Sequence, residues 1–216
     1  TSYAETIRNP LLLAINDLMW MRANNPPKLT RATLDGQKAA FANEPALYDY
    51  LQAAFALYVE HQPDNALKHL PQELPSSLDY LAFSQQTLRG LALEAKQDWK
   101  GAEALWLQLL PLAKQPLQRD QLELALAMNY ERSGQLAKVF AADSPIQTKQ
   151  VRYILLRSVA GPELLRQQIS QASDPLERST AQFVLLYKDL LRGQFATFAE
   201  DLQQLPASPA ADRKRA

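Results

Sequence analysis

The sequence predicts an all-α protein, and three features of its composition lead to that prediction. Leucine, alanine and glutamine, which are good or tolerable helix formers, dominate the chain. Glycine is scarce, with 6 residues, whereas the turns of a β-rich protein would need more of it. The 14 prolines fall between apolar-periodic segments rather than inside them, so they mark the boundaries of helices.

Reading between these boundaries gives a series of short helices. Ser76 or Ser77 is expected to cap one of them, because Ser76 and Asp79 have the spacing of a capping box. Ser173 or Asp174, followed by Pro175, is a second start signal. The expected segments are residues 10–24, 30–42, 45–60, 64–70, 77–96, 99–113, 116–133, 136–141, 146–159, a helix opened by Pro162, 175–192 and 195–205.

The chain is long and apolar enough to bury a core, with 216 residues of which 47% are hydrophobic and 21% charged. We expect one helical domain over residues 1–206, followed by a flexible tail over residues 207–216. The longest apolar stretches, such as residues 11–15 and 53–59, are far shorter than a membrane span, so no membrane insertion is expected. The formal net charge of zero argues against nucleic-acid binding, which normally needs a basic excess.

The chain offers few groups for catalysis or metal binding. It has no cysteine, which excludes thiolate chemistry, and its two histidines, His61 and His69, are interpreted as surface or helix-end residues. The carboxylates are scattered along predicted helices without a spacing that selects a pair, and no glycine-rich phosphate loop is present. We therefore expect no catalytic site, no metal and no cofactor, and interpret the basic residues 213–215 as a solvated chain end.

A pattern of small, aromatic and glycine positions occurs twice near the middle of the chain. The two copies are 37 residues apart, counted from Gln97 to Gly134, and a fainter copy follows near Gly193. The pattern resembles the tetratricopeptide repeat, whose period is about 34 residues, most clearly over residues 81–141. The matching residues are Gly90, Asp98, Trp99, Ala102 and Trp106 in the first copy; Leu126, Ala127, Tyr130, Gly134 and Leu136 in the second; and Leu186, Gly193, Phe195 and Phe198 in the third.

This resemblance implies antiparallel helical hairpins stacked as a right-handed solenoid. Another α-solenoid and an irregular bundle are the alternatives. The pattern also has a direct physical interpretation: the small residues Ala102 and Ala127 would let helices approach closely, and Gly134 would adopt a left-handed conformation that ends a helix. Gln97 stands where the family has the corresponding glycine.

The function that this resemblance favours is a non-enzymatic protein-interaction scaffold that binds a protein or peptide partner in a concave groove. The alternative is the non-catalytic α-superhelical module of a larger enzyme, such as a lytic transglycosylase, and a self-contained helical enzyme is a third possibility. The composition and the start at Thr1 favour a processed or excised bacterial cell-envelope protein in the periplasm, with the cytoplasm as the alternative. The groove candidates are Ser84, Thr87, Glu94, Gln121, Glu131 and Arg132.

Overall fold

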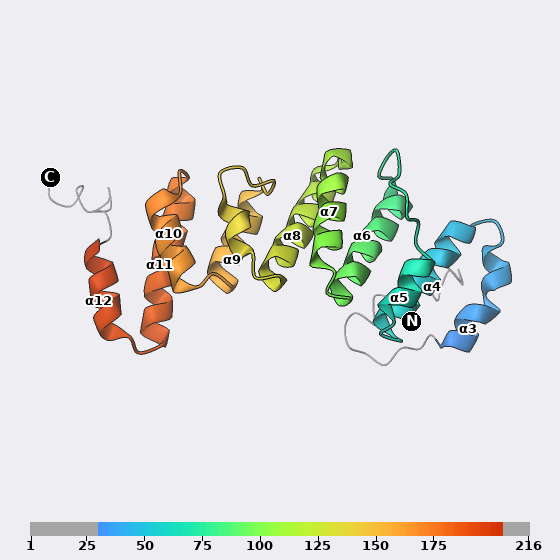
Figure 1. Cartoon of the computed structure of the whole chain (residues 1–216), viewed down its shortest axis with the longest axis horizontal. Helices are drawn as coiled ribbons and strands as arrows, with labels where there is room; N and C mark the ends of the chain where they lie inside the picture. Colours follow the sequence, from blue (N-terminus) through green and yellow to red (C-terminus); the bar gives the residue numbers. More distant parts are fainter. Residues whose placement is uncertain (1–29, 205–216) are drawn as a thin grey trace, which may run out of the picture. The chain divides into compact units, whose positions relative to one another are not determined.

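A computed structural model of the chain describes residues 30–204. All regular elements in this range are helices, which confirms the all-α fold class (Figure 1). The chain divides into two compact units, Thr1–Asn129 and Tyr130–Ala216, and the single domain expected over residues 1–206 stays a prediction. The helix expected over residues 10–24 and the tail expected over residues 207–216 lie outside the described residues.

The first unit is built from consecutive helices that pack on their neighbours. Helix α4 packs against α5 and α6, α5 against α6, and α6 against α7. Residues from α3 to α6 form one apolar core around Leu34, Leu51, Phe55 and Leu88. The elements are α3 (Arg31–Gly36), η1 (Lys38–Phe41), α4 (Pro45–Tyr58), α5 (Pro63–Lys68), α6 (Tyr80–Ala95), α7 (Trp99–Leu109), η2 (Leu110–Leu112) and α8 (Pro116–Arg132), which continues into the second unit.

The second unit is arranged around one helix. Helix α11 (Pro175–Leu191) contacts α9 (Lys149–Ser158), α10 (Pro162–Gln171) and α12 (Phe195–Gln204). A short 3-10 helix, η3 (Leu136–Phe140), precedes them. The buried apolar residues of this unit are Val139, Phe140, Ile146, Val151, Leu155, Leu156, Ala160, Leu165, Ala172, Ala181, Val184 and Leu185.

At several helices, a side chain caps the first turn and so determines where the helix begins. The carboxylates of Asp98 and Asp174 accept hydrogen bonds from the backbone N–H groups of Gly101 at 3.0 Å and Leu176 at 2.9 Å. Asp174 with Pro175 was a predicted start and is confirmed. The predicted capping box at Ser76 is wrong, because α6 begins at Tyr80 and Asp79 itself is the N-cap. A non-helical segment therefore precedes α6, and Asp79 at its end accepts from the N–H of Ala82 at 2.8 Å.

Other predicted boundaries shift at proline and glycine. The segment 30–42 is divided into α3 and η1 after Gly36, and the segment 99–113 changes to the 3-10 helix η2 around Pro111. The segment 136–141 is a 3-10 helix, and α9 starts at Lys149, three residues beyond Ile146. Ile146 is nevertheless fully buried, so the apolar residue anchors the loop to the core instead of starting the helix.

Three helices end in the same way. At Gln97, Gly134 and Gly193 the backbone has a positive φ of 62°, 73° and 69°. Each of these N–H groups donates to the carbonyl three residues earlier, and the next N–H donates to the carbonyl five residues before it. This is the Schellman motif, which satisfies the last carbonyls of α6, α8 and α11. The left-handed glycine predicted at position 134 is confirmed, and Gln97 adopts that conformation without being glycine.

Helices α6 and α7 approach closely around a buried indole ring. Trp106 is fully buried, and Gly90 lies so near it that a Cβ atom at position 90 would overlap the ring. Ala102 and, on α8, Ala127 are also fully buried, which agrees with the small-residue positions predicted from the sequence. The absence of a side chain at position 90 therefore makes room for the indole ring of Trp106.

Candidate interaction surface

The structure separates the predicted groove residues by burial. Glu94 is only 5% exposed, so it belongs to the interior of the first unit and cannot contact a partner from a groove. The hydroxyl oxygen of Thr87 is buried as well. Ser84 is half-buried, and its hydroxyl donates to the carbonyl oxygen of Tyr80 at 2.8 Å, while Gln121 is exposed. Polar character alone did not distinguish an interior carboxylate from a surface one.

Two of the predicted groove residues belong to the second unit. Glu131 and Arg132 are exposed at the end of α8, next to the left-handed Gly134. Of the six candidates, therefore, only Gln121, Glu131 and Arg132 are exposed. A shared groove that joins them stays a prediction.

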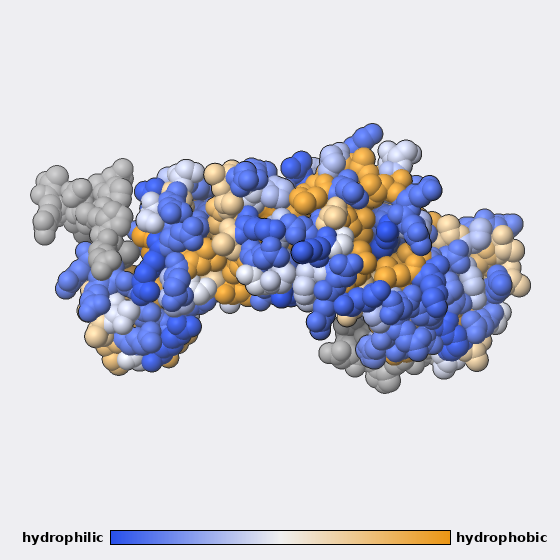
Figure 2. All heavy atoms as spheres, viewed as in Figure 1, coloured by the Kyte–Doolittle hydropathy of each residue, from blue (hydrophilic) through white to orange (hydrophobic). Residues whose placement is uncertain are grey.

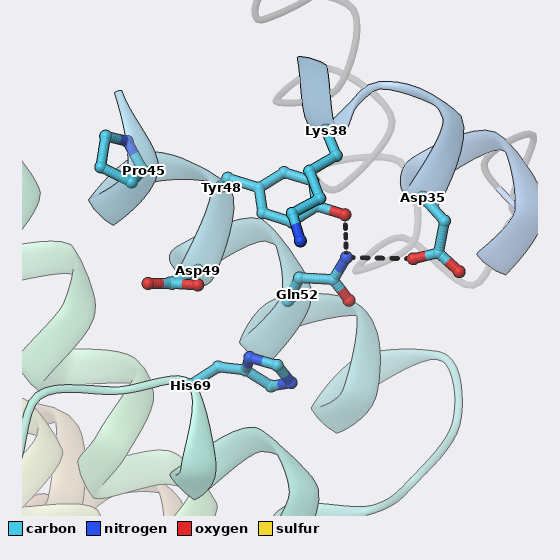
Figure 3. Close-up of a pocket in the computed structure, with 7 residues that line it drawn as sticks. All are labelled: Asp35, Lys38, Pro45, Tyr48, Asp49, Gln52 and His69. Carbon is cyan, nitrogen blue, oxygen red and sulfur yellow. Dashed lines mark hydrogen bonds between the residues drawn. The ribbon is translucent and has the colours of Figure 1, made fainter. Parts of the chain in front are cut away.

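The first unit contains a polar cavity of about 500 Å³ (Figure 3). Gln52 lies at its centre, and its amide nitrogen donates to the hydroxyl of Tyr48 at 2.6 Å and to Oδ1 of Asp35 at 3.2 Å. The guanidinium of Arg31 donates to the side-chain amide oxygen Oε1 of Gln52, and Gln52 is itself buried. The remaining lining residues are Lys38, Pro45, Asp49 and His69.

The histidine of this cavity has no partner that would prepare it for catalysis. His69 is the C-cap residue of α5, as expected for a helix-end histidine, and its backbone N–H donates to the carbonyl oxygen of Ala66 at 3.1 Å. Its imidazole forms no hydrogen bond or ion pair with another described residue. A general base needs a group that orients it and a reacting atom within reach, and His69 lacks the first. Within residues 30–204, moreover, no three His, Asp or Glu side chains gather as a metal site would require.

Charged side chains in the interior hold helices together. Arg152 on α9 makes a bidentate ion pair with Glu177 on α11, at 2.8 and 2.9 Å, and its remaining nitrogen donates to the carbonyl oxygen of Val139. Arg166 on α10 pairs with Asp201 on α12 at 2.8 Å. Each arginine is bound by a buried carboxylate, so the first pair ties α9 to α11 and the second ties α10 to α12.

Helix α11 has apolar residues on two opposite faces. One face carries Ala181, Val184 and Leu185, which are buried in the second unit. The other face is exposed, and the apolar residues on it continue at the start of α12. We call the exposed set the α11 stripe; its side chains are 44–68% exposed and comprise Leu176, Phe183, Tyr187, Leu190, Leu191 and, on α12, Phe195.

Comparisons with protein-family models, with curated proteins and with solved structures gave no match to this chain. No helix among the described residues has both the length and the apolar character needed to cross a membrane.

The α11 stripe includes no charged side chain. Its five residues on α11 lie within one side of that helix, because positions 176, 183 and 190 are two turns apart and 187 is one turn from both 183 and 191. The rings of Phe183 and Tyr187 stack on each other, with centroids 6.1 Å apart and planes inclined by 8°. At roughly 100 Å² of exposed area for each side chain, the stripe measures on the order of 600 Å², which reaches the largest apolar patches of monomeric proteins.

The sequence predicts a helix over residues 175–192, but the exposed apolar face of α11 was not expected. The signal was present as the seven-residue spacing of Leu176, Phe183 and Leu190, beside a second apolar series at Ala181 and Leu185. In the first unit, hydrophobic residues also reach the surface over α6 and α7 (Figure 2), but the exposed large apolar residues described there are spread over a loop and three helices, as Leu74, Tyr80, Leu107, Leu117 and Met128. The α11 stripe is therefore the candidate interaction surface.

Proposed function

We propose that this chain is a non-enzymatic protein-interaction scaffold that contacts its partner by helix–helix packing through the α11 stripe. The observation that carries the proposal is the uncovered row of six large apolar side chains on α11 and α12. Apolar area exposed to water has a free-energy cost of roughly 25 cal/mol per Å², so such a row favours association with another apolar surface. A location in a bacterial cell envelope is part of the proposal and rests on composition alone.

The arrangement of the charged residues supports the non-enzymatic part of the proposal. The ion pairs of Arg152 with Glu177 and of Arg166 with Asp201 each join one helix to another, and Arg31 on α3 pairs with Glu60, just beyond the end of α4. These side chains are engaged in packing, and a catalytic group would have to be free to meet a substrate. In the cavity around Gln52, too, the side-chain amide is held by three neighbours.

Site-specific photo-crosslinking tests the proposal. Phe183 is replaced by benzoyl-phenylalanine in the full chain, the protein is illuminated in an extract of its source cells, and adducts are identified by mass spectrometry. The matched control places the same group at Leu117 on α8, which is 68% exposed but is followed one turn later by the polar Gln121. We expect protein adducts from position 183 in clear excess over position 117.

Two results would contradict the proposal. Equal or absent adduct formation at positions 183 and 117 would show that the α11 stripe does not contact proteins. Turnover of peptidoglycan or of a peptide by the purified chain would contradict its non-enzymatic character.

A further inference from the structure

We infer that the α11 stripe is covered by the α11 stripe of a second copy of the chain, packed antiparallel, so that the scaffold assembles as a homodimer. The inference rests on the proposed function and names the partner at the same surface. Spacing, residue order, charge and area on α11 each bear on it.

The spacing of the stripe fits a helix as the occupant. Positions 176, 180, 183, 187 and 190 alternate steps of four and three residues, which is the spacing of the seam between two packed helices. Thr180, the one polar residue in this series, is half-buried and small. Since α11 presents this seam along nearly all of its length, a helix of similar length covers it completely, whereas a short extended peptide would leave its ends exposed.

The order of the residues along the seam fits a second copy running in the opposite direction. The stacked rings of Phe183 and Tyr187 occupy the middle, Leu176 lies toward one end, and Leu190 with Leu191 lies toward the other. A two-fold axis near Phe183 brings the aromatic residues of both copies together and sets Leu176 opposite Leu190 of the second copy. Such a contact is isologous, which is the usual geometry of a homodimer.

Charge does not oppose the meeting of two identical surfaces. The stripe has no charged side chain, and the neighbouring Lys188 and Arg178 are turned toward their own unit, where they donate to the carbonyl oxygens of Ala160 and Ala172 at 2.6 Å. The net charge of the chain is zero, so two copies do not repel each other at long range. Antiparallel packing also opposes the two helix dipoles, which is the favourable arrangement.

The area of the stripe is of the size that a dimer needs. About 600 Å² of apolar side chain per copy approaches the roughly 800 Å² that each partner contributes to a standard interface. Polar residues around the seam can supply the remainder. Phe195, from the start of α12, extends the apolar surface beyond the end of α11 and adds a third aromatic ring.

Sedimentation velocity of the full chain over a concentration series tests the dimer. We expect the parent to sediment as a dimer at micromolar concentration and the variant Phe183→Glu/Tyr187→Glu to sediment as a monomer. The control Leu117→Glu introduces one negative charge at a leucine as exposed as Phe183 and should remain dimeric. Circular dichroism must show unchanged helix content in both variants. A monomeric parent at all concentrations overturns the inference, and so does a folded Phe183→Glu/Tyr187→Glu variant that still dimerises.

Disulfide trapping tests the orientation, because the chain has no cysteine of its own. On mild oxidation, Phe183→Cys should cross-link to itself, and a mixture of Leu176→Cys and Leu190→Cys should give the mixed dimer. Leu176→Cys alone should stay unlinked, because antiparallel copies of position 176 lie about 21 Å apart along the helix axis, beyond the reach of a disulfide. Efficient self-linking of Leu176→Cys indicates a parallel dimer and overturns the antiparallel arrangement.

Different experimental results would overturn the interaction scaffold and the homodimer. A monomeric chain whose photo-crosslinker at position 183 reacts with other proteins overturns the homodimer and supports the interaction scaffold. A chain that is monomeric and forms no adducts at position 183 overturns both. Adducts between two copies of the chain support both.

Discussion

Trp106 donates a hydrogen bond from its indole Nε1 to Oε1 of Glu94, over 3.2 Å, in the interior of the α6–α7 hairpin. The two residues are twelve positions apart, and the Schellman turn at Gln97 returns the chain so that they meet. A buried indole N–H and a buried carboxylate each need a hydrogen-bonding partner, and here they serve one another.

Removing the carboxylate of Glu94 should destabilise the first unit. Glu94→Ala leaves the indole N–H of Trp106 without its acceptor, and we expect the free energy of unfolding to fall by about 1–3 kcal/mol in urea denaturation. Glu131→Ala, at an exposed glutamate, is the control and should change stability by less than about 0.5 kcal/mol. If both variants unfold alike, the hydrogen bond between Trp106 and Glu94 has no energetic role.

Enlarging the small buried residues should also destabilise the fold. Ala102→Leu and Ala127→Leu insert side-chain volume at fully buried positions, and overpacking should lower the free energy of unfolding by about 1–3 kcal/mol for each. Ala104→Leu, on the exposed side of α7, is the matched control and should leave the melting temperature nearly unchanged. Equal melting temperatures of the Ala102→Leu and Ala104→Leu variants would contradict the burial of the α7 face that carries Ala102.

Substitutions of the left-handed residues that end α6 and α8 should change the stability of the protein in opposite directions. Gly134→Ala places a Cβ atom in a conformation that costs L-residues roughly 1–2 kcal/mol, so it should destabilise the protein. Gln97→Gly relieves the same cost at φ 62° and should stabilise it by a smaller amount, because glycine also gains freedom in the unfolded chain. Gly36→Ala, where a Cβ atom meets nothing and φ is not positive, is the control. If the Gly134→Ala and Gly36→Ala variants have the same melting temperature, the Schellman geometry at Gly134 is contradicted.

The buried carboxyl of Asp189 should make the second unit less stable as the pH rises. Burial, and then the neighbouring Asp201, raise the pKa of Asp189 above its ordinary 3.8, against the opposing charges of Arg166 and Arg192. The folded state therefore holds this proton more tightly than the unfolded chain does. Its contribution to stability is fully present below the ordinary pKa and is lost as the pH rises through the folded pKa.

Asp189→Asn removes this titration while keeping the shape of the side chain. The melting temperature of the variant minus that of the parent should become more positive as the pH is raised from about 4 to 7. The lowered pKa of Asp174, caused first by its hydrogen bond to Lys149, is common to both proteins and cancels in the difference. Asp143→Asn, at an exposed carboxylate of the same unit, is the control. A difference that stays constant over this pH range would show that Asp189 is not an ionisable part of the core.

Much of the helical fold could be predicted from the sequence, because helix boundaries depend on neighbouring residues. Prolines 45, 63, 162 and 175 stand at the start of helices, where the missing N–H is harmless. Gly134 could be predicted as a left-handed helix end from its position alone. Ala102 and Ala127 were predicted as close-approach positions from a repeated pattern, and both are fully buried.

By itself, then, the sequence determined the helical class, most of the helix boundaries and the small residues between helices, since these properties are local or periodic. Only the tertiary structure decided that Glu94 lies inside, because its burial depends on Trp106 arriving from the next helix. Likewise, the sequence placed apolar residues on both faces of α11, and α9, α10 and α12 cover only the face with Ala181 and Leu185. A periodic pattern predicts which side chains share a face of a helix. Whether that face is buried depends on residues distant along the chain that pack against it.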